Sequence, residues 1–169
     1  LPWGGLHVGG AIMGVAIVAI FLANRQKKSI WGTLYKAIVG LLVISSLTGW
    51  GHFLNQELYG YPTELFLGIQ ISPEYRLPRF LEYERFVPLF LFASIWNLLG
   101  ATWFIFDSRW KTSDKLLLDG VMVGSLWFVV GRLFVELLIP DFQFNWLPAS
   151  LILLLIVVLA FQQQFTKIH

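Results

Sequence analysis

The sequence predicts an all-α integral membrane protein, a helical bundle of five transmembrane helices with one large external loop. Of its 169 residues, 57% are hydrophobic and 13% are charged, against about 25% charged residues in a typical soluble domain. A soluble protein of this size needs a polar surface that such a composition cannot supply. The apolar stretches lack the alternation of a strand, and an open sheet does not survive in lipid. The net charge of +2 is far from that of a nucleic-acid-binding surface, so no nucleic-acid partner is expected.

Helices are expected where about 20 apolar residues follow one another, the length that crosses the roughly 30 Å hydrocarbon layer. Five stretches reach or approach this length, at residues 8–23, 34–50, 86–106, 116–138 and 147–161. Residues 52–85 separate the second stretch from the third and contain three prolines, so we expect this loop to be irregular. No repeat or low-complexity segment divides the chain, which predicts a single transmembrane domain over residues 1–169.

The distribution of Lys and Arg predicts the orientation, because basic residues gather on the cytoplasmic side. Eight of the twelve basic residues fall on one side of the membrane: Arg25, Lys27, Lys28, Lys36, Arg109, Lys111, Lys115 and Lys167. The loop 52–85 holds three Arg against five Glu and is therefore expected outside. The N-terminus is then external and the C-terminus cytoplasmic. The chain begins at Leu1 with neither Met nor a signal-peptide pattern, which is typical of a processed chain or of a segment of a longer one.

Two charged residues inside the fourth stretch are the strongest functional signal, since ionisable groups are costly within a membrane. Arg132 and Glu136 are four residues apart and therefore share one helix face. At about 1.5 Å per residue, Arg132 lies roughly 9 Å below the external end of the helix, at the depth of a lipid phosphate or glycerol backbone. Two interpretations stay open. The charges neutralise each other and fix helix packing, or they form a site for an anionic lipid headgroup.

A second group of polar residues follows the second stretch, in GHFLNQELYG at residues 51–60. His52, Asn55 and Glu57 lie here at the external membrane level, where a polar loop leaving the membrane explains them as well as a binding site does. His7 is expected at the same level. Two such histidines could ligate haem or a pigment metal, although a histidine at a helix end is more often a hydrogen-bonding residue. The chain has no Cys, which excludes thiolate metal sites, and neither a metal nor another cofactor is expected.

Four stretches, in the same order, resemble segments of the bacterial prolipoprotein diacylglyceryl transferase family. GHFLNQELYG at 51–60 resembles the signature GRxGNFxNxExxG, and GGLHVGG at 4–10 resembles GGLSxHGG. FVPLFLFASIWNLL at 86–99 resembles FHPTFLYESLWNLL, and GRLFVE at 131–136, with Pro140 and Asp141, resembles FRxxxExxRxPD. The resemblance covers nearly the whole chain and matches the later spans of a full-length member.

This resemblance implies an enzyme of the bacterial plasma (inner) membrane. It moves a diacylglyceryl group from phosphatidylglycerol to the Cys thiol of prolipoproteins, without a metal. Such chemistry needs cationic and hydrogen-bonding groups at the phosphoglycerol and a base for the thiol. The resemblance further implies that Arg132 holds the lipid headgroup and that Asn55, Glu57 and Gly60 shape the polar pocket.

Several polar positions of the family carry other residues in this chain. The signature Arg aligns with Gly49 and its first Asn with His52. Two His, a Tyr and a Glu of the family align with Gly9, Val87, Phe92 and Ala93. Losing an Arg opposite a phosphate typically forfeits about 1.5–3 kcal/mol per charged hydrogen bond. The replacements are mostly apolar residues, which are stable in lipid, and scaffold residues such as Trp96 are kept. This pattern is typical of a protein that keeps the family fold but has lost the reaction.

The sequence therefore favours a catalytically degenerate member that acts as a phospholipid-binding or structural subunit of a membrane complex. Its expected partners are a phosphatidylglycerol-like phospholipid and other membrane protein subunits. The first alternative is an active transferase in which His7 or His52 is the base and Arg132 binds the phosphate. The second alternative is a membrane subunit that holds haem or a pigment through these two histidines.

Overall fold

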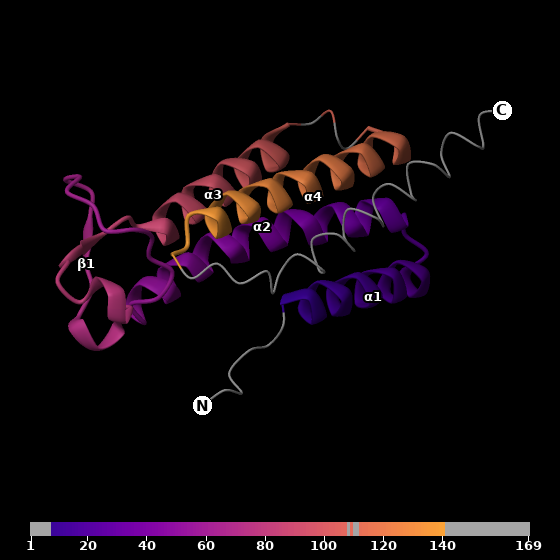
Figure 1. Cartoon of the computed structure of the whole chain (residues 1–169). Coiled ribbons are helices and arrows are strands. Elements are labelled where there is room, and N and C mark those ends of the chain that lie inside the picture. The colour runs from indigo at the N-terminus through magenta and orange to yellow at the C-terminus, as the bar shows by residue number, and fades with distance from the viewer. Residues whose placement is uncertain (1–7, 108, 110–111, 141–169) are drawn as a thin grey trace.

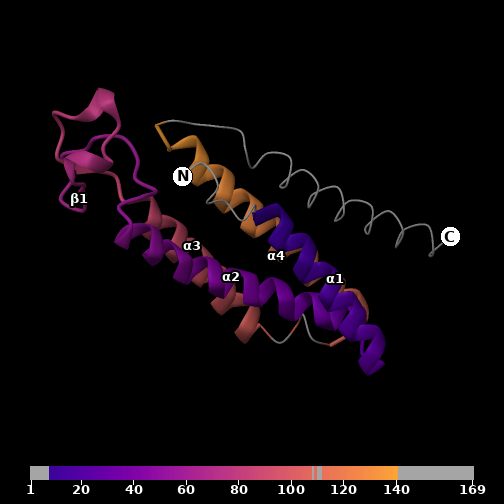
Figure 2. The ribbon, with the colours of Figure 1, turned by 90° about the horizontal axis from the view of Figure 1, so that it is seen from below.

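Four helices run side by side in the computed structural model, which describes residues 8–107, 109 and 112–140 (Figure 1). They are α1 (Val8–Gln26), α2 (Ile30–Leu54), α3 (Leu89–Phe106) and α4 (Asp114–Leu137). Residues 55–88 form what we call the head, with strands β1 (Ile69–Gln70) and β2 (Arg85–Phe86) and the short 3-10 helices η1 (Pro73–Tyr75) and η2 (Pro78–Phe80). Figures 1 and 2 both place the head at the end of the bundle where α2 ends and α3 begins.

The described part of the chain is mostly helical, as its composition predicts. Helices α2, α3 and α4 are each long and apolar enough to cross a membrane. The first predicted span, residues 8–23, is helical and forms most of α1. The fifth, residues 147–161, lies outside the described residues. The number of five spans, the external position of the loop and the orientation of the termini therefore stay predictions.

The start of α3 differs from the sequence prediction. The third span is predicted from residue 86, whereas the helix begins at Leu89. Phe86 instead pairs with Ile69 across the two strands, and Pro88 stands directly before the helix. The sequence pattern could not reveal this pairing, because an apolar residue before a helix looks the same in a strand as in a further helical turn.

Helix α2 is longer than predicted at both ends. It begins at Ile30 because Ser29 caps it, with the Ser29 Oγ accepting a hydrogen bond from the Gly32 amide at 3.3 Å. The same hydroxyl donates to Oδ1 of Asp114 at 2.6 Å and so joins the beginnings of α2 and α4. At the other end α2 continues to Leu54. His52 therefore lies in the helix, whereas the sequence predicts it as the first residue of the loop.

The core of the bundle lies where α2, α3 and α4 meet. Tyr35 and Leu42 of α2 pack against Ala101 and Phe104 of α3, and all four are at most 4% exposed. The Tyr35 hydroxyl donates to the Phe104 carbonyl, which satisfies a polar group that burial would otherwise leave unpaired.

Two tryptophans join α3 and α4 through a reciprocal contact. Trp96 and Trp127 stack with ring centroids 4.4 Å apart, and each indole N–H donates to the other residue's backbone carbonyl at 3.0 Å. Gly131 and Gly100 make room for the rings, since a Cβ there would lie 2.2 Å and 2.4 Å from an indole atom. Each helix thus supplies a Trp and, four residues later, a Gly, and this exchange fixes the register of α3 against α4.

Aromatic side chains and a two-stranded antiparallel sheet hold the head together. Ile69 pairs with Phe86 and Gln70 with Arg85. Phe86 is fully buried, with the rings of Tyr59 and Phe80 packed around it at centroid distances of 4.9 and 6.3 Å. The short elements agree with the irregular loop that the prolines predict.

Candidate functional site

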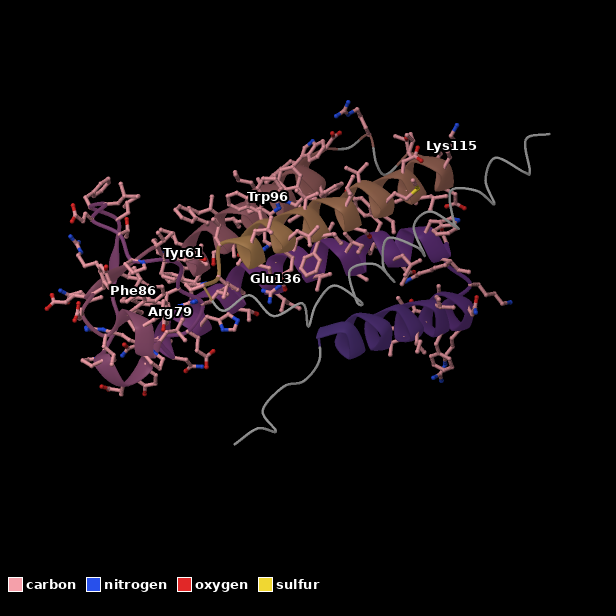
Figure 3. All side chains as sticks on the ribbon, in the orientation of Figure 1. Tyr61, Arg79, Phe86, Trp96, Lys115 and Glu136 are labelled. Carbon is pink, nitrogen blue, oxygen red and sulfur yellow. The ribbon has the colours of Figure 1, made fainter. Side chains whose placement is uncertain are left out.

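The charge pair predicted within the fourth stretch is present in α4. Arg132 Nε donates to Glu136 Oε1 at 3.3 Å, one helical turn along. The Arg132 side chain is 25% exposed and that of Glu136 is 5% exposed, so both charges are largely withdrawn from the surface. Figure 3 places Glu136 toward the head end of α4. An arginine that is paired but still partly exposed can meet a further anion, such as a phosphate, with its planar guanidinium.

The segment at residues 51–60 folds as the last turn of α2 and the first turn of the head. The Nδ1 of His52 lies 3.0 Å from Oε2 of Glu57, and the two side chains are 36% and 58% exposed. A carboxylate at Nδ1 favours the tautomer whose proton sits there, which leaves Nε2 as the acceptor. Asn55 caps α2 through its backbone N–H, which donates to the Gly51 carbonyl, while its side chain is exposed.

Gly60 is buried where the head meets the helices. Its amide donates to the Val87 carbonyl at 2.8 Å. A Cβ in its place would lie 3.0 Å from the Val87 side chain and 3.4 Å from the Leu138 carbonyl oxygen. Leu138 comes two residues after Glu136. The close backbone approach at Gly60 therefore lays the 51–60 segment against the end of α4 that carries the charge pair.

The structure thus gathers most of the predicted site residues at the head end of the bundle. Arg132 and Glu136 reach this end from α4, while His52, Asn55 and Glu57 reach it from the end of α2. His7 lies outside the described residues, so its position and its place in a haem or pigment site are untested. Within the described ranges, no group of three or more His, Asp or Glu residues is arranged to hold a metal ion.

Two features of the 51–60 segment escape sequence reasoning. Gln56 and Leu58 have positive φ angles of 56° and 53°, which non-glycine residues rarely adopt. The Gln56 side chain also accepts a hydrogen bond from the Ser72 amide at 2.6 Å. No glycine marks the left-handed positions, so the sequence carries no signal for this bend. The bend directs the chain from α2 into the head, and the hydrogen bond of Gln56 restricts the backbone conformation there.

The burial of four polar side chains between the spanning helices could not be predicted from the sequence. They are Ser46, Ser94, Asn97 and Ser125, each at most 9% exposed. The Oγ atoms of Ser94 and Ser125 and the Oδ1 of Asn97 find no hydrogen-bond partner in the part of the chain that the structure describes. Small polar residues let helices approach closely in a membrane, which explains their presence in these contacts.

Gly49 lies at a close approach of α2 to α3. A Cβ at this position would lie 2.2 Å from Ser94 Oγ and 2.9 Å from the Phe90 carbonyl oxygen. The aromatic rings of Trp50 and Phe90 pack beside this contact with centroids 5.6 Å apart. The face of α2 at Gly49 is therefore filled by α3 and has no room for a side chain.

These features define a helical membrane protein with a candidate anion site. It has helices that can cross a membrane, a largely buried charge pair, and a head between α2 and α3. The profile of the family described as prolipoprotein diacylglyceryl transferase matches residues 1–165. The chain belongs to this family, which confirms the resemblance seen in its four motifs.

Several curated relatives are named phosphatidylglycerol–prolipoprotein diacylglyceryl transferase. The relative from Chloroflexus aggregans is 37% identical over 154 residues, which cover 80% of this chain and 49% of the relative. The relative from Cutibacterium acnes is 35% identical over 82% of this chain and 46% of its own length. The relative from Streptococcus pneumoniae is 30% identical over 95% of this chain and 63% of its own length. The chain thus spans about half to two thirds of these proteins. No solved structure matched it.

Proposed function

We propose that this chain is a phospholipid-binding member of the family that has lost the transfer reaction. In this proposal it acts as a lipid-binding or structural subunit of a larger assembly in the bacterial plasma membrane. The observation that carries the proposal is the filled contact at Gly49, the position that matches the arginine of the family signature.

The contact at Gly49 bears on catalysis because the missing charge cannot be supplied from that position without moving a helix. The Phe90 carbonyl is backbone and cannot rotate away, so any side chain at residue 49 requires α2 and α3 to separate. The negative charge of a phosphate leaving group is stabilised by cationic or hydrogen-bonding groups that are held in fixed positions. Val87, Phe92 and Ala93 stand where the resemblance expects three further polar groups. These substitutions support a chain that keeps the scaffold without the reaction.

Arg132 supports the lipid-binding part of the proposal. Its guanidinium is held by Glu136 in the part of α4 that lies toward the head. The relatives are named for phosphatidylglycerol, a lipid with one phosphodiester charge. A guanidinium matches a phosphate through two parallel hydrogen bonds. We therefore infer that Arg132 binds the phosphate of an anionic glycerophospholipid, with the pocket completed by Asn55, Glu57 and Gly60 as the resemblance implies.

Lipid retention by the purified full chain tests this part. Phosphatidylglycerol that remains bound in mild detergent is quantified for the parent chain and for the double variant Arg132→Gln/Glu136→Gln. The double variant is chosen because a single change would leave one buried charge unpaired and could unfold the bundle. Arg25→Gln is the matched control, since it removes one exposed charge from the last turn of α1, at the other end of the bundle.

We expect the double variant to retain at least about tenfold less phosphatidylglycerol, because one charged hydrogen bond is worth about 1.5 kcal/mol or more. The Arg25→Gln control is expected to match the parent chain. Equal retention by all three proteins would mean that Arg132 does not bind the lipid phosphate. Purification of the chain as a stable, monodisperse monomer that copurifies with no partner would count against the subunit role.

A second candidate function, an active diacylglyceryl transferase, is favoured by the contact between His52 and Glu57. Glu57 would hold the proton on Nδ1, so that Nε2 of His52 takes the proton of a prolipoprotein thiol. The thiolate would then attack the diacylglyceryl carbon. A C–S bond forms and the C–O bond to the phosphate breaks. Glycerol phosphate leaves, and its negative charge is stabilised by the guanidinium of Arg132.

An activity assay separates the two candidates. The chain is incubated with phosphatidylglycerol and a peptide that carries a lipoprotein signal-sequence Cys, and the thioether product is measured. We expect no product above that of empty membranes. Product that is lost in His52→Gln and kept in Arg25→Gln would overturn the degenerate function and establish the active one.

A further inference from the structure

A turn in the head, residues 63–68, carries three consecutive large apolar side chains at its surface. Leu65, Phe66 and Leu67 are 65%, 83% and 48% exposed. In Figure 1 the segment that leads into β1 extends from the head on the side away from the two 3-10 helices. Apolar side chains exposed on α2, α3 and α4 belong to helices that are long and apolar enough to cross a membrane. Those of the turn lie outside these helices, and a contiguous apolar surface there indicates an interaction site.

Hydrogen bonds hold the turn in one conformation. The Leu65 amide donates to Thr63 Oγ1 at 3.2 Å, and the Gly68 amide donates to the Leu65 carbonyl at 2.9 Å. From outside the turn, Arg85 Nη2 donates to the Phe66 carbonyl at 3.3 Å. The apolar side chains are therefore presented on an ordered backbone, which lowers the entropy lost when they bind.

The turn lies near the membrane because it is tied to the strand that leads into α3. The Thr63 amide donates to the Arg85 carbonyl at 3.0 Å, and Arg85 precedes Leu89, the first residue of α3, by four positions. Four residues span at most about 14 Å. With 18 residues, α3 is about 27 Å long, slightly less than the roughly 30 Å hydrocarbon layer, and the headgroups add about 5–8 Å on each side. Arg85 therefore lies at most about 14 Å from Leu89, a distance that includes the whole headgroup layer.

We propose that residues 65–67 dock on the lipid headgroup region of the same membrane, on the side of the head. Their side chains enter the boundary between headgroups and acyl chains, where aromatic and aliphatic groups are stable. Arg85 lies beside the turn with an exposed side chain and meets lipid phosphate at that level. The docked turn holds the head against the membrane surface, in addition to the two chain segments that join it to α2 and α3.

Site-directed spin labelling tests this proposal directly, because the chain contains no Cys. The full chain carrying Phe66→Cys is labelled and placed in vesicles of phosphatidylcholine with a minor share of phosphatidylglycerol. Collision with oxygen, which partitions into lipid, is compared with collision with a nickel chelate, which stays in water. Glu74→Cys is the matched control, since Glu74 is an exposed residue of η1 in the same head.

We expect the label at position 66 to collide more with oxygen and the label at position 74 to collide more with the nickel chelate. Leu65→Cys is expected to agree with Phe66→Cys, which guards against a local disturbance at one site. Equal exposure to the nickel chelate at 66 and 74 would overturn the proposal. So would spin–spin broadening at 66 that disappears on dilution with unlabelled chain, because it would assign the turn to a contact between two copies.

Discussion

Replacing Gly49 by alanine measures how closely α2 and α3 approach at the position that matches the signature arginine. The new Cβ would lie 2.2 Å from Ser94 Oγ and 2.9 Å from the Phe90 carbonyl oxygen. The hydroxyl can rotate, but the carbonyl can move only with its helix. The substitution therefore has to shift α3 against α2 or distort the backbone at this point.

The magnitude follows from two opposing effects. Overpacking of this kind typically costs about 1–3 kcal/mol, whereas alanine gains about 1 kcal/mol over glycine in helix propensity. Gly51→Ala is the matched control, since Gly51 is exposed two residues along the same helix and a Cβ there would meet no heavy atom within 4 Å. The propensity gain is shared by both variants. We therefore expect Gly49→Ala to be about 1–3 kcal/mol less stable than Gly51→Ala.

Ser94→Ala separates the two clashes. Its hydroxyl is buried and has no partner among the described residues, so its removal alone is expected to leave stability unchanged or slightly raised. In the double variant Gly49→Ala/Ser94→Ala, the nearest atom of residue 94 is its Cβ at 3.5 Å, an ordinary contact. Part of the lost stability should return, and the remainder reports the clash with Phe90.

Reversible unfolding of the purified chain in mixed detergent micelles gives the free energies for this comparison. Equal stability of Gly49→Ala and Gly51→Ala would refute the close approach of α2 and α3. A side chain could then be accommodated at residue 49, and the contact at Gly49 would no longer favour a lost reaction.

Three further predictions concern local contacts. Gly131→Ala places a Cβ 2.2 Å from the Trp96 ring and is expected to be about 1–3 kcal/mol less stable in unfolding free energy than Gly40→Ala, which has open space around it and the same gain in helix propensity. Hydrogen bonds from Arg109 lower the pKa of Asp107 from 3.8 to about 2, so the stability that the pair contributes is complete above pH 3.8 and is lost as the pH falls through about 2. The difference in melting temperature between the parent chain and Asp107→Asn should accordingly close over that interval, and a difference that persists below it contradicts the assignment. Ser29→Ala removes the cap of α2 and is expected to lower the unfolding free energy by about 1 kcal/mol, with Ser29→Thr retaining most of it.

The features that the sequence could predict are those that depend on local pattern. Helices follow from long apolar stretches, and the Arg132–Glu136 contact follows from a spacing of four on one helix. Family membership follows from four ordered motifs, since each motif is a short run of neighbours. The contact between His52 and Glu57 was not predicted, because its geometry depends on the bend after α2.

The features that the sequence could not reveal depend on which surfaces meet. The filled face at Gly49 arises from Phe90 and Ser94, which lie on a different helix beyond the whole of the head. From the sequence alone, a glycine in a helix indicates only low helix propensity. Its role in packing is visible once the residues of the adjacent helix are known. The strand at Phe86 has the same origin, because its partner Ile69 lies across the head.

The exchange of indole hydrogen bonds between Trp96 and Trp127 has a consequence for how the bundle can rearrange. A slide of α4 by one residue would displace it about 1.5 Å along α3 and rotate it about a third of a turn, which breaks both bonds and moves Gly131 away from the Trp96 ring that it makes room for. The exchange therefore opposes a slide of α3 against α4. Arg132 directly follows Gly131, so the level of its guanidinium along α3 is fixed by this contact and changes only if the contact breaks.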